Sequence, residues 1–419
     1  MSNGRYRRVA FAPLSPARVV PAGESDAEQA RVTECRHSGP CIVFAGPGAG
    51  KSHCLICRLK GLLRESADFR VLVLTFTVPG SEVLGRRVKK TGMSRQRVVV
   101  RRTQQVTWRA FAAAHRDTEG RATLSVAAQA MARRLLAQAV RDECLYPVDL
   151  ERIVRRALKS IEELTELPAD IAAVIAPGVL ERYHRLKARE RVVDNGDVRK
   201  WAMENAEEIV AGWVAEGYTH VFLDEAQDSS PAEIALMEAV ARAGMQVCCV
   251  LDLRQALYGF RGARARALVN ALVCIDGSHT HVLVVNRRSA ARPIATLNAF
   301  AAWAFDGETA LPMSALRVGG EPFRAVVCEE AAEVCDGLGT ALAAVAGLTR
   351  ANVQHAPKAD AWLRDALGLP EKVGRSQSIG ILAATAKEAD SIVRALEAVG
   401  FAPVRGREGT IRDLASVSR

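Results

Sequence analysis

Short strand-like runs separated by helical patterns mark the first quarter of the chain. The runs are Cys41–Phe44, Val71–Thr75 and Arg97–Arg101. A helical pattern from Lys51 to about Glu65 follows the first run, and a basic helical segment follows the second. Continuous apolar runs of this length, bounded by helices, are typical of strands buried on both faces of a parallel sheet. The stretch from Asp26 to roughly Arg116 therefore predicts the beginning of a doubly wound α/β sheet.

The middle of the chain, from about Thr118 to Gly217, lacks such runs. Its apolar residues recur at helical spacing, as in Met131, Leu135, Leu136 and Val140. This spacing predicts a helical insertion. Strand-like runs return at Val221–Leu223 and Gln246–Leu251, and we expect them to complete the first sheet.

A second α/β region is expected after Ala263. Its strand candidates are Val282–Val285, Phe323–Cys328 and Ser378–Ala383. Its expected helices cover about 289–304, 329–346 and 386–399, and the prolines of Leu348–Gln377 indicate a loop-rich connection.

These patterns divide the chain into four parts. We predict a first α/β domain from residues 25–117 and 218–275, a helical insertion over 118–217 and a second α/β domain over 276–419. Residues 1–24 are expected to form a disordered basic arm, because prolines interrupt any amphipathic helix there. A chain of 419 residues is also too long for one typical hydrophobic core.

The charge of the chain favours a polyanionic partner. There are 57 basic and 47 acidic residues, which gives a net charge of +10. The excess is concentrated between Glu82 and Ala110, a segment with nine basic residues and one acidic residue. Such a balance is typical of nucleic-acid binding, although a solvated helix face has the same composition.

The cysteine pattern and the hydropathy indicate in which cellular compartment the protein is expected. Ten cysteines are scattered without paired metal-ligand spacing, and no second CxxC answers Cys54 and Cys57. This pattern favours reduced, buried thiols over disulfides or a metal site. No apolar stretch approaches the roughly 18 to 20 residues needed to span a bilayer. We therefore expect a cytoplasmic protein with no membrane association.

A glycine-rich loop follows the first strand-like run. The sequence Ala45-Gly46-Pro47-Gly48-Ala49-Gly50-Lys51-Ser52 stands between that run and the predicted helix. Such a loop aims backbone N–H groups at phosphate oxygens from a helix N-terminus, so Gly46, Gly48, Ala49 and Gly50 would surround the phosphates. Lys51 would supply a positive charge and Ser52 a ligand to Mg²⁺.

An acidic pair follows a later run. Asp224 and Glu225 come directly after His220–Leu223, so Asp224 would lie at the carboxyl end of a strand. There Asp224 can hold Mg²⁺ while Glu225 polarises the attacking water. An Asp-Glu pair alone is also a common helix N-cap. The two motifs in this order favour a nucleotide triphosphatase.

Six further motifs, in order, resemble those of the UvrD/Rep-type DNA helicases of superfamily 1. They are Gln29, Thr75-Phe76-Thr77, Thr107-Trp108-Arg109-Ala-Phe111, Val193–Val198, Asp252–Ala263 and Asn286–Ser289. The segment Asp252–Ala263 is the most diagnostic, because it joins Gln255 to the aromatic residues Tyr258 and Phe260. The resemblance covers the chain from about Gln29 to its end and corresponds to the front two-thirds of such a helicase.

The resemblance implies the fold, the cofactors and the site. The fold would be a P-loop NTPase with a RecA-like parallel sheet, a helical insertion and a second, incomplete RecA-like domain. The cofactors would be ATP and Mg²⁺. Gln29 would read the adenine, Gln255 would sense the γ-phosphate, and Arg288 would reach that phosphate when the domains close. DNA contacts would come from Thr75, Phe76, Thr107, Trp108, Tyr258, Phe260 and Arg261.

The chain also departs from the family pattern. Val78, Arg109 and Leu251 replace a usual Asn, His and Gly. Arg287 stands where the family has a Tyr that stacks on adenine, and an Arg can lie flat against a purine in its place. The chain stops before the last two family motifs, so we expect weak ATPase activity and little duplex unwinding without a protein partner that supplies them.

Two hypotheses remain open at this point. The first is an ATP-dependent DNA translocase or helicase that acts on single-stranded DNA or on single/double-strand junctions, alone or with a partner. The alternative is a regulatory or structural DNA-binding subunit that uses ATP as a switch and has little or no helicase activity.

Overall fold

The computed structural model describes eight stretches of the chain: residues 7–9, 16–36, 38–143, 149–175, 177–255, 264–304, 312–319 and 325–327. The chain divides into two compact units, residues 14–322 and residues 1–13 with 323–419. In the smaller unit, strands β1 (Arg7–Val9) and β12 (Ala325–Val327) pair antiparallel. The elements expected between 329 and 399 lie outside the described residues.

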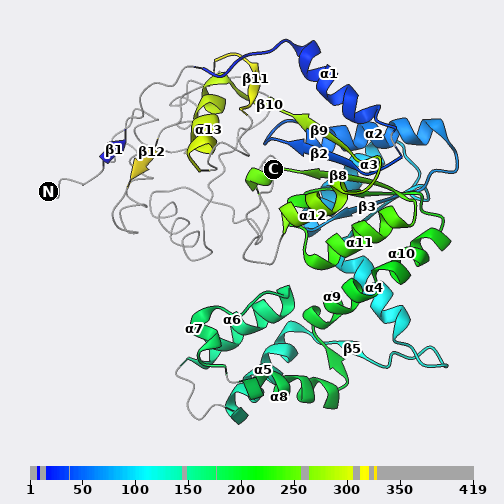
Figure 1. Ribbon diagram of the computed structural model, residues 1–419, viewed down its shortest axis with the longest axis vertical. Helices are drawn as coiled ribbons and strands as arrows, with labels where there is room; N and C mark the ends of the chain where they lie inside the picture. The colour runs from blue at the N-terminus through cyan, green and yellow to red at the C-terminus, as the bar shows by residue number, and fades with distance from the viewer. Residues whose placement is uncertain are drawn as a thin grey trace, which may run out of the picture. The chain divides into compact units, whose positions relative to one another are not determined.

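The larger unit is built on a six-stranded sheet with the order β4-β3-β7-β8-β2-β9 (Figure 1). Its strands are β2 (Cys41–Ala45), β3 (Val71–Thr75), β4 (Val98–Arg102), β7 (His220–Leu223), β8 (Gln246–Leu251) and β9 (His279–Leu283). Every neighbouring pair is parallel. The expected α/β fold with a parallel sheet is therefore confirmed.

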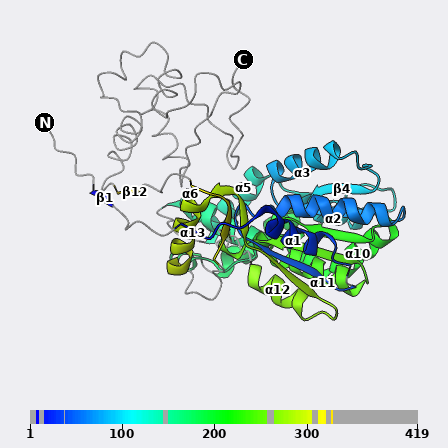
Figure 2. The same cartoon turned by 90° about the horizontal axis from the view of Figure 1, so that it is seen from above.

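Helices cover both faces of this sheet (Figure 2). One face packs against α1 (Ala22–Thr33), α2 (Lys51–Glu65) and α3 (Val78–Lys90). The other packs against α4 (Thr103–Ala114), α9 (Asn195–Glu204), α10 (Ala206–Ala215), α11 (Pro231–Arg242) and α12 (Ala265–Val273). Alternate strand residues enter opposite cores: Val43 faces α2, whereas Ile42 faces α11 and α12. Burial on both faces explains why the strands read as continuous apolar runs.

A separate hydrophobic core lies between α4 and α9 in the sequence. It is formed by α5 (Gln129–Glu143), α6 (Leu150–Glu163), α7 (Ala169–Ala172) and α8 (Pro177–Arg189), with the short parallel pair β5 (Ser125–Val126) and β6 (Val192–Val193). Helices α9 and α10 fall inside the helical stretch expected over 118–217, but their apolar residues pack in the core of the sheet.

Two expectations about the ends of this unit were wrong. The sequence predicted a strand at Val282–Val285 in a second α/β domain. In the structure, His279–Leu283 instead forms the edge strand β9 of the first sheet, beside β2. The next strand, β10 (Val285–Ala290), pairs with β11 (Ser314–Arg317), and α13 (Ala291–Ala304) connects them. Residues 16–24, expected in a disordered arm, bond to this pair: the Ala315 N–H donates to Arg18 O, and the Val20 N–H donates to Ala315 O. Both placements depend on partners more than 200 residues away, which local patterns do not encode.

Among the described residues, no helix has both the length and the apolar character required to cross a bilayer.

Candidate functional site

The loop between β2 and α2 is shaped to approach an anion closely. Gly48 and Gly50 have φ values of 72° and 94°, and Gly50 is the residue that precedes the first turn of α2. A side chain at Gly50 would also come within 2.6 Å of the Gln29 amide. Only glycine adopts this backbone conformation without strain. The free N–H groups at the start of the 15-residue α2 therefore point out of a tight, glycine-dependent loop.

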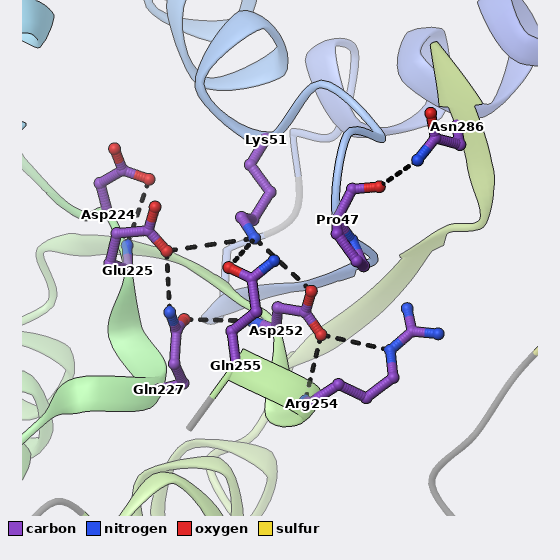
Figure 3. A network of polar contacts seen from close by, with 9 residues as sticks. All are labelled: Pro47, Lys51, Asp224, Glu225, Gln227, Asp252, Arg254, Gln255 and Asn286. Carbon is purple, nitrogen blue, oxygen red and sulfur yellow. Dashed lines mark hydrogen bonds and ion pairs between the residues drawn. The ribbon is translucent and has the colours of Figure 1, made fainter. Parts of the chain in front are cut away.

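Lys51 is the centre of a polar network (Figure 3). Its Nζ lies 3.4 Å from Gln255 Oε1, 3.7 Å from Asp252 Oδ2 and 4.0 Å from Glu225 Oε2. The Lys51 side chain is only 10% exposed. The partners come from the segments that follow β7 and β8, because neighbouring parallel strands end at the same edge of the sheet. The structure thus brings Lys51, Glu225 and Gln255, three residues expected to be catalytic, to one place.

The acidic pair after β7 has two different environments. Asp224 is 7% exposed, while the Glu225 side chain is 41% exposed. Burial, together with the neighbouring Glu225 carboxylate, raises the pKa of Asp224 to about 6. Glu225 has a φ of 55°, a left-handed conformation that is uncommon for a non-glycine residue and is often found at functional sites.

Gln227 and Asp252 connect the acidic pair to the next strand. Gln227 lies in the short helix η1 (Ala226–Asp228); its amide nitrogen donates to Glu225 Oε2 at 2.8 Å, and its amide oxygen accepts from the Asp252 N–H at 3.1 Å. Gln227 and Asp252 were not expected as site residues, although Asp252 begins the motif Asp252–Ala263 and Gln227 follows the acidic pair. The sequence could have indicated them, because Gln227 stands close to Glu225 and Asp252 stands close to Gln255.

The carboxylates fit a divalent cation. Asp252 is 3% exposed; among the described residues its buried Oδ2 has no hydrogen-bond partner and lies 3.7 Å from the Lys51 ammonium. Asp224 is buried with a raised pKa, and a bound cation would lower that pKa by favouring the ionised carboxylate. Oxygen ligands of this type suit Mg²⁺. Ser52, the other expected ligand, is half-buried on the first turn of α2.

Residues beyond the sheet reach the same loop. Asn286 on β10 donates from Nδ2 to Pro47 O at 2.6 Å (Figure 3). The Arg287 N–H donates to Gly48 O at 2.9 Å. The Arg287 guanidinium binds Asp26 at 2.5 Å. Asp26 lies on α1, as does Gln29, which is 7% exposed and donates to Ala49 O at 3.2 Å. Gln29 and Arg287 therefore both lie next to the phosphate loop, and Asn286 is a contact that motif reading missed.

Arg288 is not part of this network. Its side chain is exposed, and among the described residues it forms no hydrogen bond or ion pair with the groups around Lys51. Its backbone N–H donates to Asn286 Oδ1 at 2.8 Å.

The residues expected to contact DNA differ in exposure. Thr75 and Thr107 are buried, 1% and 5% exposed, and the Thr107 hydroxyl donates to Gln104 O. Phe76 is half-buried against the core of the sheet. Trp108 is 37% exposed and is therefore available to a base. Tyr258, Phe260 and Arg261 lie outside the described residues.

The acidic motif around Asp194 forms a buried contact that connects two helices. Asp194 is fully buried; it accepts from Lys187 Nζ at 2.7 Å and from the Tyr183 hydroxyl at 2.9 Å. It also caps α9 in a reciprocal arrangement with Asp197. Burial alone would raise the pKa of Asp194, but Lys187 outweighs this effect and leaves the pKa below its ordinary value. The ion pair ties α8 of the insertion to α9 of the sheet domain.

The region that contains this site is similar to known proteins. A model of the UvrD/REP helicase N-terminal domain matches residues 25–272. The ATP-dependent DNA helicase PcrA of Staphylococcus aureus (strain Mu50 / ATCC 700699) is 23% identical over 264 residues, which is 60% of this chain and 36% of the relative. PcrA of Leuconostoc citreum is 24% identical over 291 residues, 65% of this chain and 38% of the relative. The matched region thus spans little more than a third of the length of these relatives.

Proposed function

The chain belongs to the UvrD/REP helicase family, and on this premise we propose that it is an ATP-dependent DNA translocase or helicase that hydrolyses ATP and binds single-stranded DNA. The observation that carries the proposal is the network around Lys51. Glu225, Asp252 and Gln255 all lie within 4.0 Å of its ammonium group. In phosphoryl transfer a phosphate-loop lysine binds the phosphates, carboxylates hold Mg²⁺, and a nearby residue positions the attacking water.

At this site the chain's own residues divide the work. The N–H groups at the start of α2 and the Lys51 ammonium would bind the β- and γ-phosphates of ATP. Ser52 and Asp224 would hold Mg²⁺, which neutralises phosphate charge when bound. Glu225, more exposed than Asp224, would accept a proton from the attacking water. Gln29 and Arg287 would bind the base, because both lie beside the loop.

Gln255 is suited to report the state of the nucleotide to the DNA path. It contacts Lys51 and ends the short helix η2 (Leu253–Gln255). Tyr258, Phe260 and Arg261 follow within six residues. When Lys51 turns to a phosphate, its contact with Gln255 must weaken, and the segment that begins at Gln255 is released from this restraint. Aromatic and basic residues there would stack on bases and bind phosphates of single-stranded DNA.

Arg288 would act only after a rearrangement. It is exposed and separate from the network around Lys51. We propose that it approaches the γ-phosphate when the elements that follow β9 close on the loop, which would add positive charge in the transition state.

The test is ATP hydrolysis by the purified chain with and without single-stranded DNA. Turnover that rises on addition of DNA supports a translocase. The alternative is an ATP-switched DNA-binding subunit. It would be favoured if the chain binds nucleotide but does not hydrolyse it without DNA, with DNA, or with DNA and added cellular extract. Strand separation assayed on a duplex with a single-stranded tail then distinguishes a helicase from a translocase and shows whether a protein partner is needed.

A further inference from the structure

A cluster of metal-ligating side chains lies at the end of the sheet away from the phosphate loop. Cys35, Cys41 and His281 each offer a ligand atom, and these atoms all lie within 4.8 Å of one another. Cys41 begins β2, whereas the phosphate loop follows its last residue, Ala45. Four residues of strand separate them by about 13 Å. The cluster is therefore distinct from the nucleotide site.

The three groups come from three segments that the sheet brings together. Cys35 follows α1 and is 5% exposed; Cys41, on β2, is 1% exposed. His281 is half-buried on the edge strand β9, two residues beyond the register partner of Cys41. No spacing in the sequence connects residues 35, 41 and 281, and this is why the cysteine pattern did not indicate a metal site.

A fourth donor lies beside Cys41. Cys248 on β8 is the register partner of Cys41, is 1% exposed and belongs to the same face of the sheet. The thiols of Cys41 and Cys248 are hydrogen-bonded to each other. Two cysteines on neighbouring strands, a third cysteine and a histidine make a Cys₃His set, which is typical of structural zinc.

The cluster contains polar groups that protein contacts leave unsatisfied. His281 Nε2 is buried and lacks a hydrogen-bond partner among the described residues. Buried polar atoms are nearly always paired, so an orphaned imidazole nitrogen beside two thiols is better suited to a ligand than to the protein core.

A buried cation balances the charge of such a site. Arg58 on α2 is 3% exposed, and its Nη1 donates to Cys35 O and Val32 O. Zinc with three thiolates and a neutral imidazole carries a charge of −1, which the guanidinium would offset. A buried charge needs such a partner.

The cluster is also accessible to an ion. A hollow open to solvent is lined by Arg31, Glu34, Cys35, Arg36 and His281. An entry path of this kind is one requirement of a metal site.

We propose that Cys35, Cys41, His281 and Cys248 bind one zinc ion that fastens the edge strand β9 and the α1–β2 connection to the sheet. In a tetrahedral zinc site the ligand atoms lie about 3.3 to 3.8 Å apart. The ligand atoms of Cys35, Cys41 and His281 lie within 4.8 Å of one another, so these three need to approach by about 1 Å. The Cys248 thiol would join them when the ion binds. Among the described residues β9 is an edge strand paired with β2, so a metal bridge to β2 would further secure this edge of the sheet.

The test uses the full 419-residue chain loaded with zinc and freed of excess metal. We expect one zinc per chain in the wild type, and a pronounced loss in Cys41→Ser and His281→Ala. Cobalt in place of zinc should give the near-ultraviolet charge-transfer band of thiolate ligands and the intense visible bands of a tetrahedral site. Cys54→Ala is the matched control, since Cys54 is equally buried on α2 but is not part of the cluster, and it should retain the metal.

A second measurement requires no mutation. Zinc should protect Cys35, Cys41 and Cys248 from alkylation in the wild type, mapped by peptide mass, while the exposed Cys274 stays reactive. Wild type that holds no more zinc than His281→Ala, or a cobalt spectrum without the thiolate band, overturns the proposal. Undiminished zinc affinity in Cys248→Ala overturns the assignment of the fourth ligand. Equal loss of zinc in Cys54→Ala shows that binding depends on the general fold and also overturns the site.

Discussion

Lys51 Nζ lies 3.4 Å from Gln255 Oε1, so the phosphate loop contacts the residue that begins the segment carrying Tyr258 and Phe260. The two residues are 204 positions apart and belong to different turns at the same edge of the sheet. This contact connects the nucleotide site to the proposed DNA path. Gln255 and Asp252 both contact the Lys51 ammonium group, which is the group proposed to bind phosphates.

We expect Gln255→Ala to separate nucleotide binding from DNA stimulation. The variant keeps Lys51 and the loop, so ATP affinity should change little. A hydrogen bond to a charged group contributes about 1.5 to 3 kcal/mol, which corresponds to roughly 10- to 100-fold in DNA-stimulated turnover. The measurement is ATPase activity against DNA concentration, with Gln246→Ala, a partly exposed residue at the far end of β8, as the control. Full DNA stimulation in Gln255→Ala would contradict the coupling.

Lys51→Ala and Glu225→Gln should fail in different ways. Removal of the Lys51 charge weakens ATP binding itself, because that charge holds the phosphates. Glu225→Gln leaves the metal ligands in place but removes the base, so ATP should bind and persist without hydrolysis. Equilibrium binding of labelled ATP and single-turnover hydrolysis distinguish the two. If both variants bind and hydrolyse ATP like the wild type, the catalytic assignment is wrong.

Binding of Mg²⁺ and ATP should weaken as the pH falls through about 6. The pKa of Asp224 is raised to about 6, so its carboxyl group is protonated below that pH and cannot hold a cation. The folded state of the metal-free protein also binds this proton more tightly than the unfolded state. Its contribution therefore favours folding at low pH and is lost as the pH rises through 6. Asp224→Asn should remove the pH dependence of Mg²⁺-dependent ATP affinity between pH 5 and 7, as titrations at several pH values would show.

Lys187→Met should destabilise the chain strongly. It leaves the buried carboxylate of Asp194 without its cation, which typically costs about 3 to 5 kcal/mol. The double variant Lys187→Met/Asp194→Asn should recover part of the loss, because the uncompensated charge is gone. Since the pKa of Asp194 is lowered, the stability from this pair is present above pH 4 and disappears as the pH falls below the folded pKa. Urea denaturation at pH 7 and at pH 3 checks both statements, and Lys200→Met, on an exposed pair, is the control.

Trp108→Ala should weaken single-stranded DNA binding by about 1 to 3 kcal/mol, the range for one base-stacking platform. Trp108 is exposed on α4, so the melting temperature should change little. Phe111→Ala on the same helix is the matched contrast: Phe111 is buried and packs against Trp201, so its loss should destabilise the fold instead. Fluorescence anisotropy with labelled oligonucleotides and thermal melting measure the two effects.

Phe260→Ala is expected to lose affinity in the same range as Trp108→Ala, whereas Arg261→Ala should reduce the salt dependence of binding, because a phosphate contact releases counterions. A Phe260→Ala variant with a lower melting temperature but unchanged affinity per folded molecule would place the DNA path elsewhere.

The amino-acid sequence alone determined the features that depend on neighbouring residues. The strand Val71–Thr75 and the helix Lys51–Glu65 have the predicted bounds, since continuous apolar runs and helical periodicity are local signals. The phosphate loop was also readable, because its glycines must stand next to Lys51 for the backbone to turn there. The acidic pair Asp224 and Glu225 was also predicted, because it directly follows an apolar strand-like run in the sequence.

Only the tertiary structure decided which distant residues meet. Backbone hydrogen bonds place β9 at the edge of the sheet and join residues 16–24 to β11. Because nearly every residue carries the same backbone donor and acceptor, the sequence does not specify these partners. The meeting of Lys51 with Asp252 and Gln255 depends on the strand order, which places β2 beside β8. The same strand order brings Cys41 next to Cys248 and His281, residues that no sequence spacing connects. Side-chain type is a property of the chain, but proximity across a parallel sheet is a property of its topology.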